Sequence, residues 1–198
     1  MILAYHVIVS AYGFWLPNDP RGSWSDFVAA WEFFRYGGKA TKVETTKSVA
    51  HVSHDRNARF AMKHHLKYPP VRWNGFQARA IASGFAHAAR ESGYSALACT
   101  ILHDHAHVVI ARTDRPISQV VAHLKGRATQ QLRDESIHPF EPFEDADGNV
   151  PCMWARKYWK VFVDNESHVR SAIRYVENNP LREGKRKQRW KFVVSRTR

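Results

Sequence analysis

Two histidines, His105 and His107, stand two residues apart in the segment HDHAHVVI. On a β-strand, residues at this spacing leave the same face of the sheet, about 6.5 to 7 Å apart along the strand. Two imidazoles so placed can bind one metal ion. The spacing is also typical of polar residues on the solvated side of an amphipathic strand, so the pair alone leaves both interpretations open. A three-histidine zinc site that includes His103 is a rival, although a turn at His103 and Asp104 would point that side chain elsewhere.

A second pair, Tyr175 and Asn179, is spaced i and i+4 in a segment with helical periodicity. Residues at this spacing share one face of an α-helix, and here they lie at the edge of the apolar stripe, where they can face a cleft. A tyrosine hydroxyl is a nucleophile once its proton is removed, and an amide oxygen can bind a metal ion. Taken singly, Tyr175 also fits a boundary residue with its hydroxyl in water, and Asn179 fits a helix-ending residue before Pro180.

The elements that must position these pairs follow from apolar periodicity. In chain order we expect a strand over residues 4–12, a helix between Gly75 and Gly93, two strands (LACTIL and HAHVVIAR) joined by a tight turn, a helix after Pro116, the strand CMWARKYWKVFV, and a helix from about Glu166 to Asn179. Gly93 and Pro116 are residue types that end and begin helices. The last helix is expected to stop at Asn179 because Pro180 disfavours helical backbone at the residue before it.

This order of strands and helices predicts an α+β fold, with an antiparallel sheet of four to five strands and helices packed on one face. A length of 198 residues fits a single domain over residues 1–198. The front half departs from the pattern, since residues 37–60 show no clean period and only a short helix, from about Asp26 to Arg35, is indicated. We interpret residues at about 16–75 as an insertion. The basic tail at about 185–198 could be a last strand, a phosphate-contacting arm, or both.

The charge of the chain favours a polyanionic partner. Lysine and arginine number 30 against 18 acidic residues, a formal net charge of +12, and such a field attracts nucleic acid. A membrane surface is a weaker candidate, because no basic helix has a large apolar face. Cys99 and Cys152 are the only cysteines and lie far apart, which indicates a reducing compartment rather than a disulfide framework. The apolar start lacks the basic and small-residue regions of a signal peptide.

Read together, these segments resemble the HUH-type single-tyrosine transposases, and among them the REP-associated tyrosine transposases, also called IS-type transposase-like proteins. The resemblance rests on the H-x-H strand, the helix with LKGRATQQL, the aromatic strand MWARKYW and the segment YVENNPLREG. The opening strand AYHVIVSAYG is similar as well. The resemblance extends over about residues 4–15 and 76–194, and its most specific part is the joint spacing of H-x-H and Y-x-x-x-N-P.

By this resemblance the fold is the ferredoxin-like fold of HUH endonucleases. His105 and His107 are implied to bind Mg²⁺ or Mn²⁺, Asn179 to complete the metal site, and Tyr175 to be the nucleophile. The implied reaction is attack of Tyr175 on a DNA phosphodiester, which leaves a 5′-phosphotyrosine bond and a free 3′-hydroxyl. Because that bond stores the energy of the phosphodiester, the strand can be rejoined without a nucleotide cofactor.

The chain departs from the family pattern in three places. Ala106 stands between the two histidines where a bulky apolar residue is usual, and His103 replaces a usual proline. Ala106 is expected to weaken the packing beneath the histidines without removing them. The insertion lengthens the front half and bears on dimer geometry and on the choice of substrate.

The expected function is metal-dependent cleavage and rejoining of single-stranded DNA, at hairpin-flanked sites. The expected partner is single-stranded or hairpin DNA, bound by a monomer or homodimer in the bacterial cytoplasm and associated with the nucleoid. Two alternatives remain: a DNA-binding protein derived from a transposase that has lost the reaction, and a metal-dependent nuclease that uses water. Cations that would follow the DNA backbone, with an aromatic ring to stack on bases, are Lys125, Arg127, Lys185, Arg186, Lys187, Arg189 and Trp190.

Overall fold

The computed structural model describes residues 1–23, 28, 39–42, 49 and 51–194. The chain divides into two compact units, one formed by Met1–Ala11 with Arg72–Arg198 and the other by Tyr12–Val71. The second unit overlaps the insertion predicted at about residues 16–75, and the single-domain organisation stays a prediction. In the part of the chain described, no helix is long and apolar enough to cross a membrane.

The first unit is built on a four-stranded antiparallel sheet in the order β2-β3-β1-β4. The strands are β1 (Ala4–Ala11), β2 (Ala96–Ile101), β3 (His105–Ala111) and β4 (Trp154–Val163). β1 pairs with β3 on one side and with β4 on the other, so the start of the chain lies in the interior of the sheet. The predicted α+β class, the antiparallel sheet and the hairpin of β2 and β3 are confirmed.

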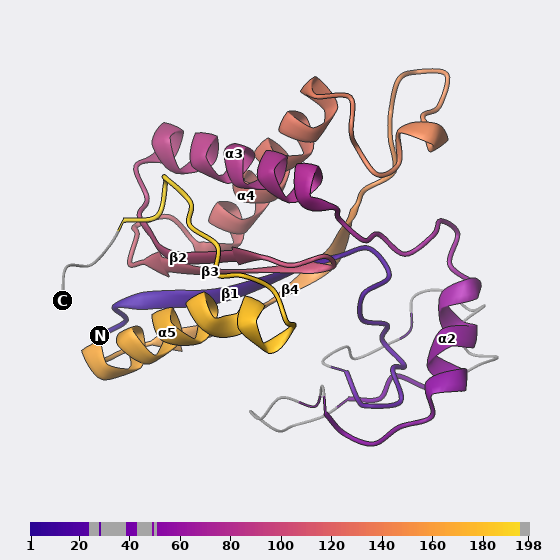
Figure 1. Ribbon diagram of the computed structural model, residues 1–198, viewed down its shortest axis with the longest axis horizontal. Helices are drawn as coiled ribbons and strands as arrows, with labels where there is room; N and C mark the ends of the chain where they lie inside the picture. Colours follow the sequence, from indigo (N-terminus) through magenta and orange to yellow (C-terminus); the bar gives the residue numbers. More distant parts are fainter. Residues whose placement is uncertain (24–27, 29–38, 43–48, 50, 195–198) are drawn as a thin grey trace. The chain divides into compact units, whose positions relative to one another are not determined.

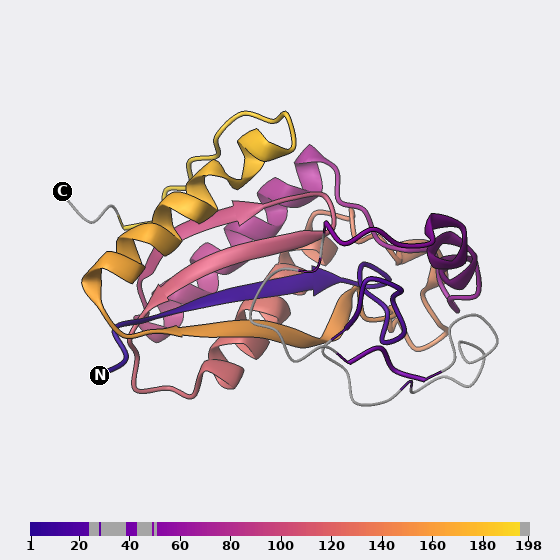
Figure 2. The ribbon, with the colours of Figure 1, turned by 90° about the horizontal axis from the view of Figure 1, so that it is seen from below.

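Three helices cover this sheet, and their placement differs from the prediction. α3 (Gly75–Ser92) and α4 (Ile117–Asp134) lie over one face, whereas α5 (Glu166–Arg182) lies over the other, as two perpendicular views show (Figures 1 and 2). Helices were expected on one face alone. The pattern was misleading because the face of β2 and β3 beneath α5 carries Thr100 and His107, polar residues typical of a solvated face, yet both are buried.

α3 and the start of α4 lie where they were predicted. Asn74 and Gln77 form a reciprocal capping box at the start of α3, and Gly93 ends that helix in the left-handed region at φ 68°. α4 begins directly after Pro116. The two helices pack closely at Gly84, where a Cβ would lie 2.6 Å from both the backbone nitrogen of Ala128 and the carbonyl oxygen of Arg127.

α5 continues past its predicted end at Asn179, through Pro180 to Arg182. Proline has no N–H, so the carbonyl of Val176 lacks its usual donor one turn further on. The hydroxyl of Thr100 on β2 donates to that carbonyl at 2.7 Å. A side chain from the sheet therefore replaces the missing backbone hydrogen bond, and the helix runs on.

The basic tail lies along the outer edge of β2. The side chain of Gln188 accepts a hydrogen bond from the N–H of Ile101 at 2.8 Å and donates to the carbonyl of the same residue at 2.7 Å. Further along, Val193 forms an isolated parallel bridge with Ala96. Within the described residues the tail makes this contact with the edge but forms no named strand.

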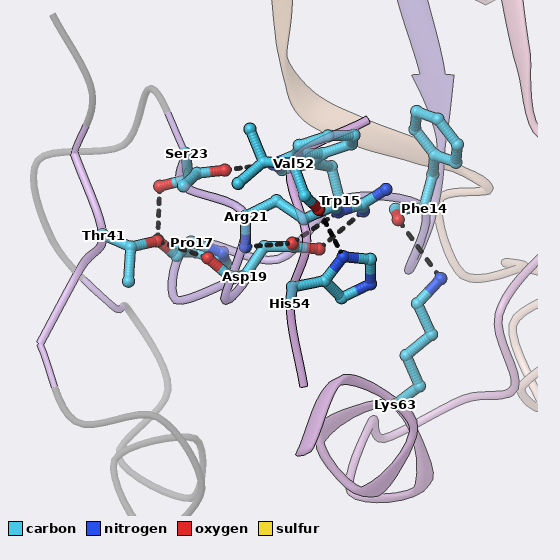
Figure 3. Close-up of polar contacts among 11 residues, drawn as sticks. Phe14, Trp15, Pro17, Asp19, Arg21, Ser23, Thr41, Val52, His54 and Lys63 are labelled. Carbon is cyan, nitrogen blue, oxygen red and sulfur yellow. Dashed lines mark hydrogen bonds and ion pairs between the residues drawn. The ribbon is translucent and has the colours of Figure 1, made fainter. Parts of the chain in front are cut away.

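The second unit contains α2 (Arg56–His64) and a loop held by polar contacts (Figure 3). The buried carboxylate of Asp19 accepts two hydrogen bonds from the guanidinium of Arg21, at 2.7 and 2.8 Å. That guanidinium lies 3.7 Å from the centre of the Trp15 ring. Thr41 donates to the carbonyl of Asp19 at 2.7 Å. The short helix predicted from Asp26 to Arg35 falls almost entirely outside the described residues.

Candidate active site

The histidine pair lies on β3, on the sheet face covered by α5. The ring centres of His105 and His107 are 4.9 Å apart and the rings are nearly perpendicular. Ala106 between them points to the opposite face and is fully buried, with Val9 and Ile101 as its strand partners. The alternation of β3 therefore places both imidazoles on one side of the sheet.

α5 brings the second pair to the same place. The ring of Tyr175 lies 5.7 Å from that of His107, centre to centre, and is 38% exposed. Asn179 lies one turn further along the helix and is buried. The helix is held against the sheet by Val169 and Val176, which pack in one cluster with apolar residues of the strands. Thr100 beneath Val176 is the strand partner of His107, so its bond to α5 ties the helix directly beside the histidine strand.

Both histidines are held through Nδ1. The Nδ1 of His105 lies 2.8 Å from a carboxylate oxygen of Asp104, and the Nδ1 of His107 lies 3.0 Å from the Nε2 of His6. Histidine ligands of metals are usually oriented in this way, through the ring nitrogen that does not face the metal. A metal would therefore be bound through Nε2 of each ring.

Burial lowers the pKa of two rings at the site, those of His6 and His107. It lowers the pKa of His6 to about 4, and burial, with the nearby rings of His105 and His6, lowers the pKa of His107 well below 6.5. His6 and His107 are therefore neutral imidazoles at neutral pH. For Asp104, burial raises the pKa, but the hydrogen bond and charge of His105 and the charges of His103 and Arg72 outweigh it, so the pKa lies below its usual range.

His103 is not part of this group. Its Nε2 lies 3.0 Å from Asp104, and its Nδ1 lies 3.0 Å from the ammonium of Lys185. Among the residues described, no three His, Cys, Asp or Glu side chains are arranged to hold a metal ion. The alternative three-histidine zinc site is therefore not formed by the described residues.

Two residues at the site were not predicted. His6 lies on β1, is 8% exposed and contacts the rings of His107, Trp159 and Tyr175. The guanidinium of Arg182 lies 4.9 Å from the centre of the Tyr175 ring. The available signal for His6 was a histidine within a mostly apolar first strand. Arg182 was not predicted because the helix was expected to end before it.

Three of the predicted DNA-contacting residues, Lys125, Arg127 and Lys185, have partners within the protein. Lys125 donates to the carbonyl of Ala155 at 2.8 Å, beside an open cavity of about 450 Å³ between α4 and β4, and Arg127 pairs with Glu91. Lys185 is engaged by Glu183 and His103. The remaining members lie on the tail: Arg186, Lys187 and Arg189 are exposed, and Trp190 is partly buried.

Comparison with known proteins places these residues in context. Residues 63–179, more than half of the chain, match the family described as Transposase IS200 like. That stretch contains both histidines, Tyr175 and Asn179. No curated protein matches the chain.

Two solved structures are similar to this chain at low sequence identity. One is a REP-associated tyrosine transposase bound to a REP hairpin, with a TM-score of 0.49 and 10% identity over 92% of this chain and 68% of that one. The other is a protein of Deinococcus radiodurans R1, provisionally named a transposase, with a TM-score of 0.42 and 14% identity over 95% and 94%. At these scores the family assignment rests on the sequence match alone.

Proposed function

Since the chain belongs to the IS200-like transposase family, whose members process DNA, we propose that it cleaves and rejoins single-stranded DNA through a covalent bond to Tyr175. The observation that carries the proposal is the approach of the Tyr175 ring to the His107 ring, 5.7 Å between centres. A helix residue and a strand residue far apart in the sequence meet there, with His105 beside them. One chain supplies all three, so the proposal needs no second copy.

In the proposed reaction, the hydroxyl of Tyr175 attacks the phosphorus of a phosphodiester, and the bond from phosphorus to the 3′ oxygen breaks. The phenol loses its proton and the departing oxygen gains one, so the products are a 5′-phosphotyrosine and a free 3′-hydroxyl. Attack of a 3′-hydroxyl on the phosphotyrosine reverses the step and rejoins the strand. Arg182, whose guanidinium lies over the Tyr175 ring, would pair with the oxygens of the phosphate.

We assign a divalent metal, Mg²⁺ or Mn²⁺, to His105, His107 and Asn179. The donor set fits, since Nδ1 of each imidazole is engaged within the protein and burial keeps His107 neutral, as a ligand must be. The amide oxygen of Asn179 suits a hard cation. When bound, the metal would withdraw charge from the phosphate oxygens and hold them in line for attack.

The test is a covalent adduct. Labelled single-stranded DNA that carries a hairpin, incubated with the protein and Mn²⁺, is expected to yield a protein–DNA species that survives denaturant. Tyr175→Phe should abolish it, whereas Tyr158→Phe, a matched change on β4, should leave it intact. An adduct that persists in Tyr175→Phe would show that another residue is the nucleophile.

The same experiment separates the two alternatives. A DNA-binding protein without the reaction would retain the hairpin in a native gel but form no adduct. A nuclease that uses water would release cut DNA with no protein attached, and Tyr175→Phe would still cut. Either result would overturn the proposed reaction.

A further inference from the structure

His6 occupies an unusual position for a histidine. It lies on β1, in the interior of the sheet, and is 8% exposed. Its register explains the contact with His107: Ile8 is the strand partner of His107, and His6 is the diagonal neighbour on the same face. Side chains in this diagonal relation are within reach of each other when they are long or aromatic. The Nε2 of His6 accordingly lies 3.0 Å from the Nδ1 of His107.

The position of one proton decides what this contact can do. The two facing nitrogens lie at hydrogen-bond distance, 3.0 Å, so one of them carries a hydrogen and the other accepts it. A metal bound through Nε2 of His107 requires a lone pair there, and hence a proton on Nδ1 of that ring. His6 must then accept through Nε2 and keep its own proton on Nδ1.

The surroundings of His6 keep its ring in place for this role. The His6 ring makes edge-to-face contacts with the rings of Trp159 and Tyr175, each at 5.7 Å between ring centres. The planes of the His6 and His107 rings differ by 28° and their centres are 5.3 Å apart, which is compatible with an in-plane hydrogen bond between them. A buried ring enclosed on three sides has few alternative rotamers, so its acceptor nitrogen stays directed at His107.

We propose that His6 is a positioning residue for the metal site: by accepting a hydrogen bond from Nδ1 of His107, it fixes the tautomer and orientation that present Nε2 of His107 to a divalent cation. The inference rests on the metal site proposed above. Carboxylates and backbone carbonyls commonly take this part. Here a second histidine takes it, and the same ring also contacts the proposed nucleophile.

The first test needs no metal. Nitrogen NMR of imidazole-labelled protein at neutral pH is expected to show His107 protonated on Nδ1. His6→Leu removes the acceptor and should convert His107 largely to the Nε2-protonated form, while His6→Gln, whose side-chain oxygen can accept, should retain the Nδ1 form. A wild-type His107 that is protonated on Nε2 would overturn the proposal, whether or not any variant folds.

The second test measures Mn²⁺ binding by titration calorimetry. His6→Leu should weaken it by about 10-fold to 100-fold, the usual effect of losing such a partner, and His6→Gln should recover most of the affinity. His138→Leu is the matched control, a buried histidine outside the site that should leave Mn²⁺ affinity unchanged. Equal affinities for His6→Leu and wild type would contradict the role. If wild type bound no Mn²⁺ while His107 kept its Nδ1 proton, the proposed metal site would fail and the hydrogen-bond assignment would stand.

Discussion

Burial governs the protonation of three histidines in the described part of the chain, two of them at the site. In the described chain His6, His107 and His138 are all buried, and burial lowers the pKa of each. A neutral imidazole can accept a hydrogen bond or bind a metal, whereas a charged ring, which has a proton on each nitrogen, can only donate. Holding such groups neutral has a cost at acidic pH, because the unfolded chain takes up protons that the folded chain excludes.

His138 allows that cost to be measured away from the site. Burial, with a smaller contribution from Arg133, lowers its pKa from 6.5 to about 4. His138 therefore has no such effect on stability above pH 6.5, and the folded state is increasingly destabilised as the pH falls from 6.5 toward 4. Between pH 7 and pH 5 the loss is about 2 kcal/mol in the free energy of unfolding.

Urea unfolding at the two pH values tests this. His138→Asn, which keeps an acceptor for the N–H of Phe140, should reduce the drop in stability by about that 2 kcal/mol. An identical drop in the variant and wild type would show that His138 is not the group responsible.

At the scale of elements, the surroundings of two helix glycines predict that a change to alanine will have opposite effects on stability. Gly84→Ala would drive a methyl group into the backbone of α4 and should cost about 1 to 3 kcal/mol. Gly126→Ala, on α4, places its methyl group in open space and should add about 0.5 to 1 kcal/mol through helix propensity alone. Thermal unfolding measures both. Shifts in the same direction would contradict the close packing of α3 on α4.

The bond from Thr100 to α5 makes a second prediction. Thr100→Val removes the hydroxyl that donates to the buried carbonyl of Val176. Because Pro180 has no N–H to donate in its place, the change should lower the free energy of unfolding by about 1 to 3 kcal/mol. Thr100→Ser keeps the hydroxyl and should be closer to wild type. Because this bond holds α5 beside β3, the valine variant should also form the Tyr175 adduct more slowly. Equal stabilities and rates for the two variants would contradict this account.

At the scale of the whole molecule, the net charge of +12 should appear in the salt dependence of DNA binding. Replacing Arg186, Lys187 and Arg189 by glutamine should flatten the plot of log affinity against log salt, by about 0.7 for each phosphate of a single strand that these side chains neutralise in the wild type. Arg79→Gln is the control, since that arginine is already paired with Glu135. A tail variant with an unchanged slope would remove the tail from the DNA-binding surface.

The sequence predicted much of this molecule because its strongest signals are local. The period-two strands, the glycine and proline boundaries and the spacing of His105, His107, Tyr175 and Asn179 are all carried by short segments. What could not be predicted depends on residues far apart in the chain. α5 covers the second face of the sheet, Thr100 extends that helix, and His6 meets His107 only through the pairing of β1 with β3.

The side chain of Gln188 covers part of the outer edge of β2. A strand at the edge of a sheet offers unpaired backbone groups to any other extended chain, and β2 is such a strand. The amide of Gln188 satisfies both backbone groups of Ile101, as a neighbouring strand would, and the charged residues on either side of it repel a second copy. A chain cut before Gln188 is therefore expected to pair at the edge of β2 with other copies, which light scattering of the truncated and full-length chains would measure.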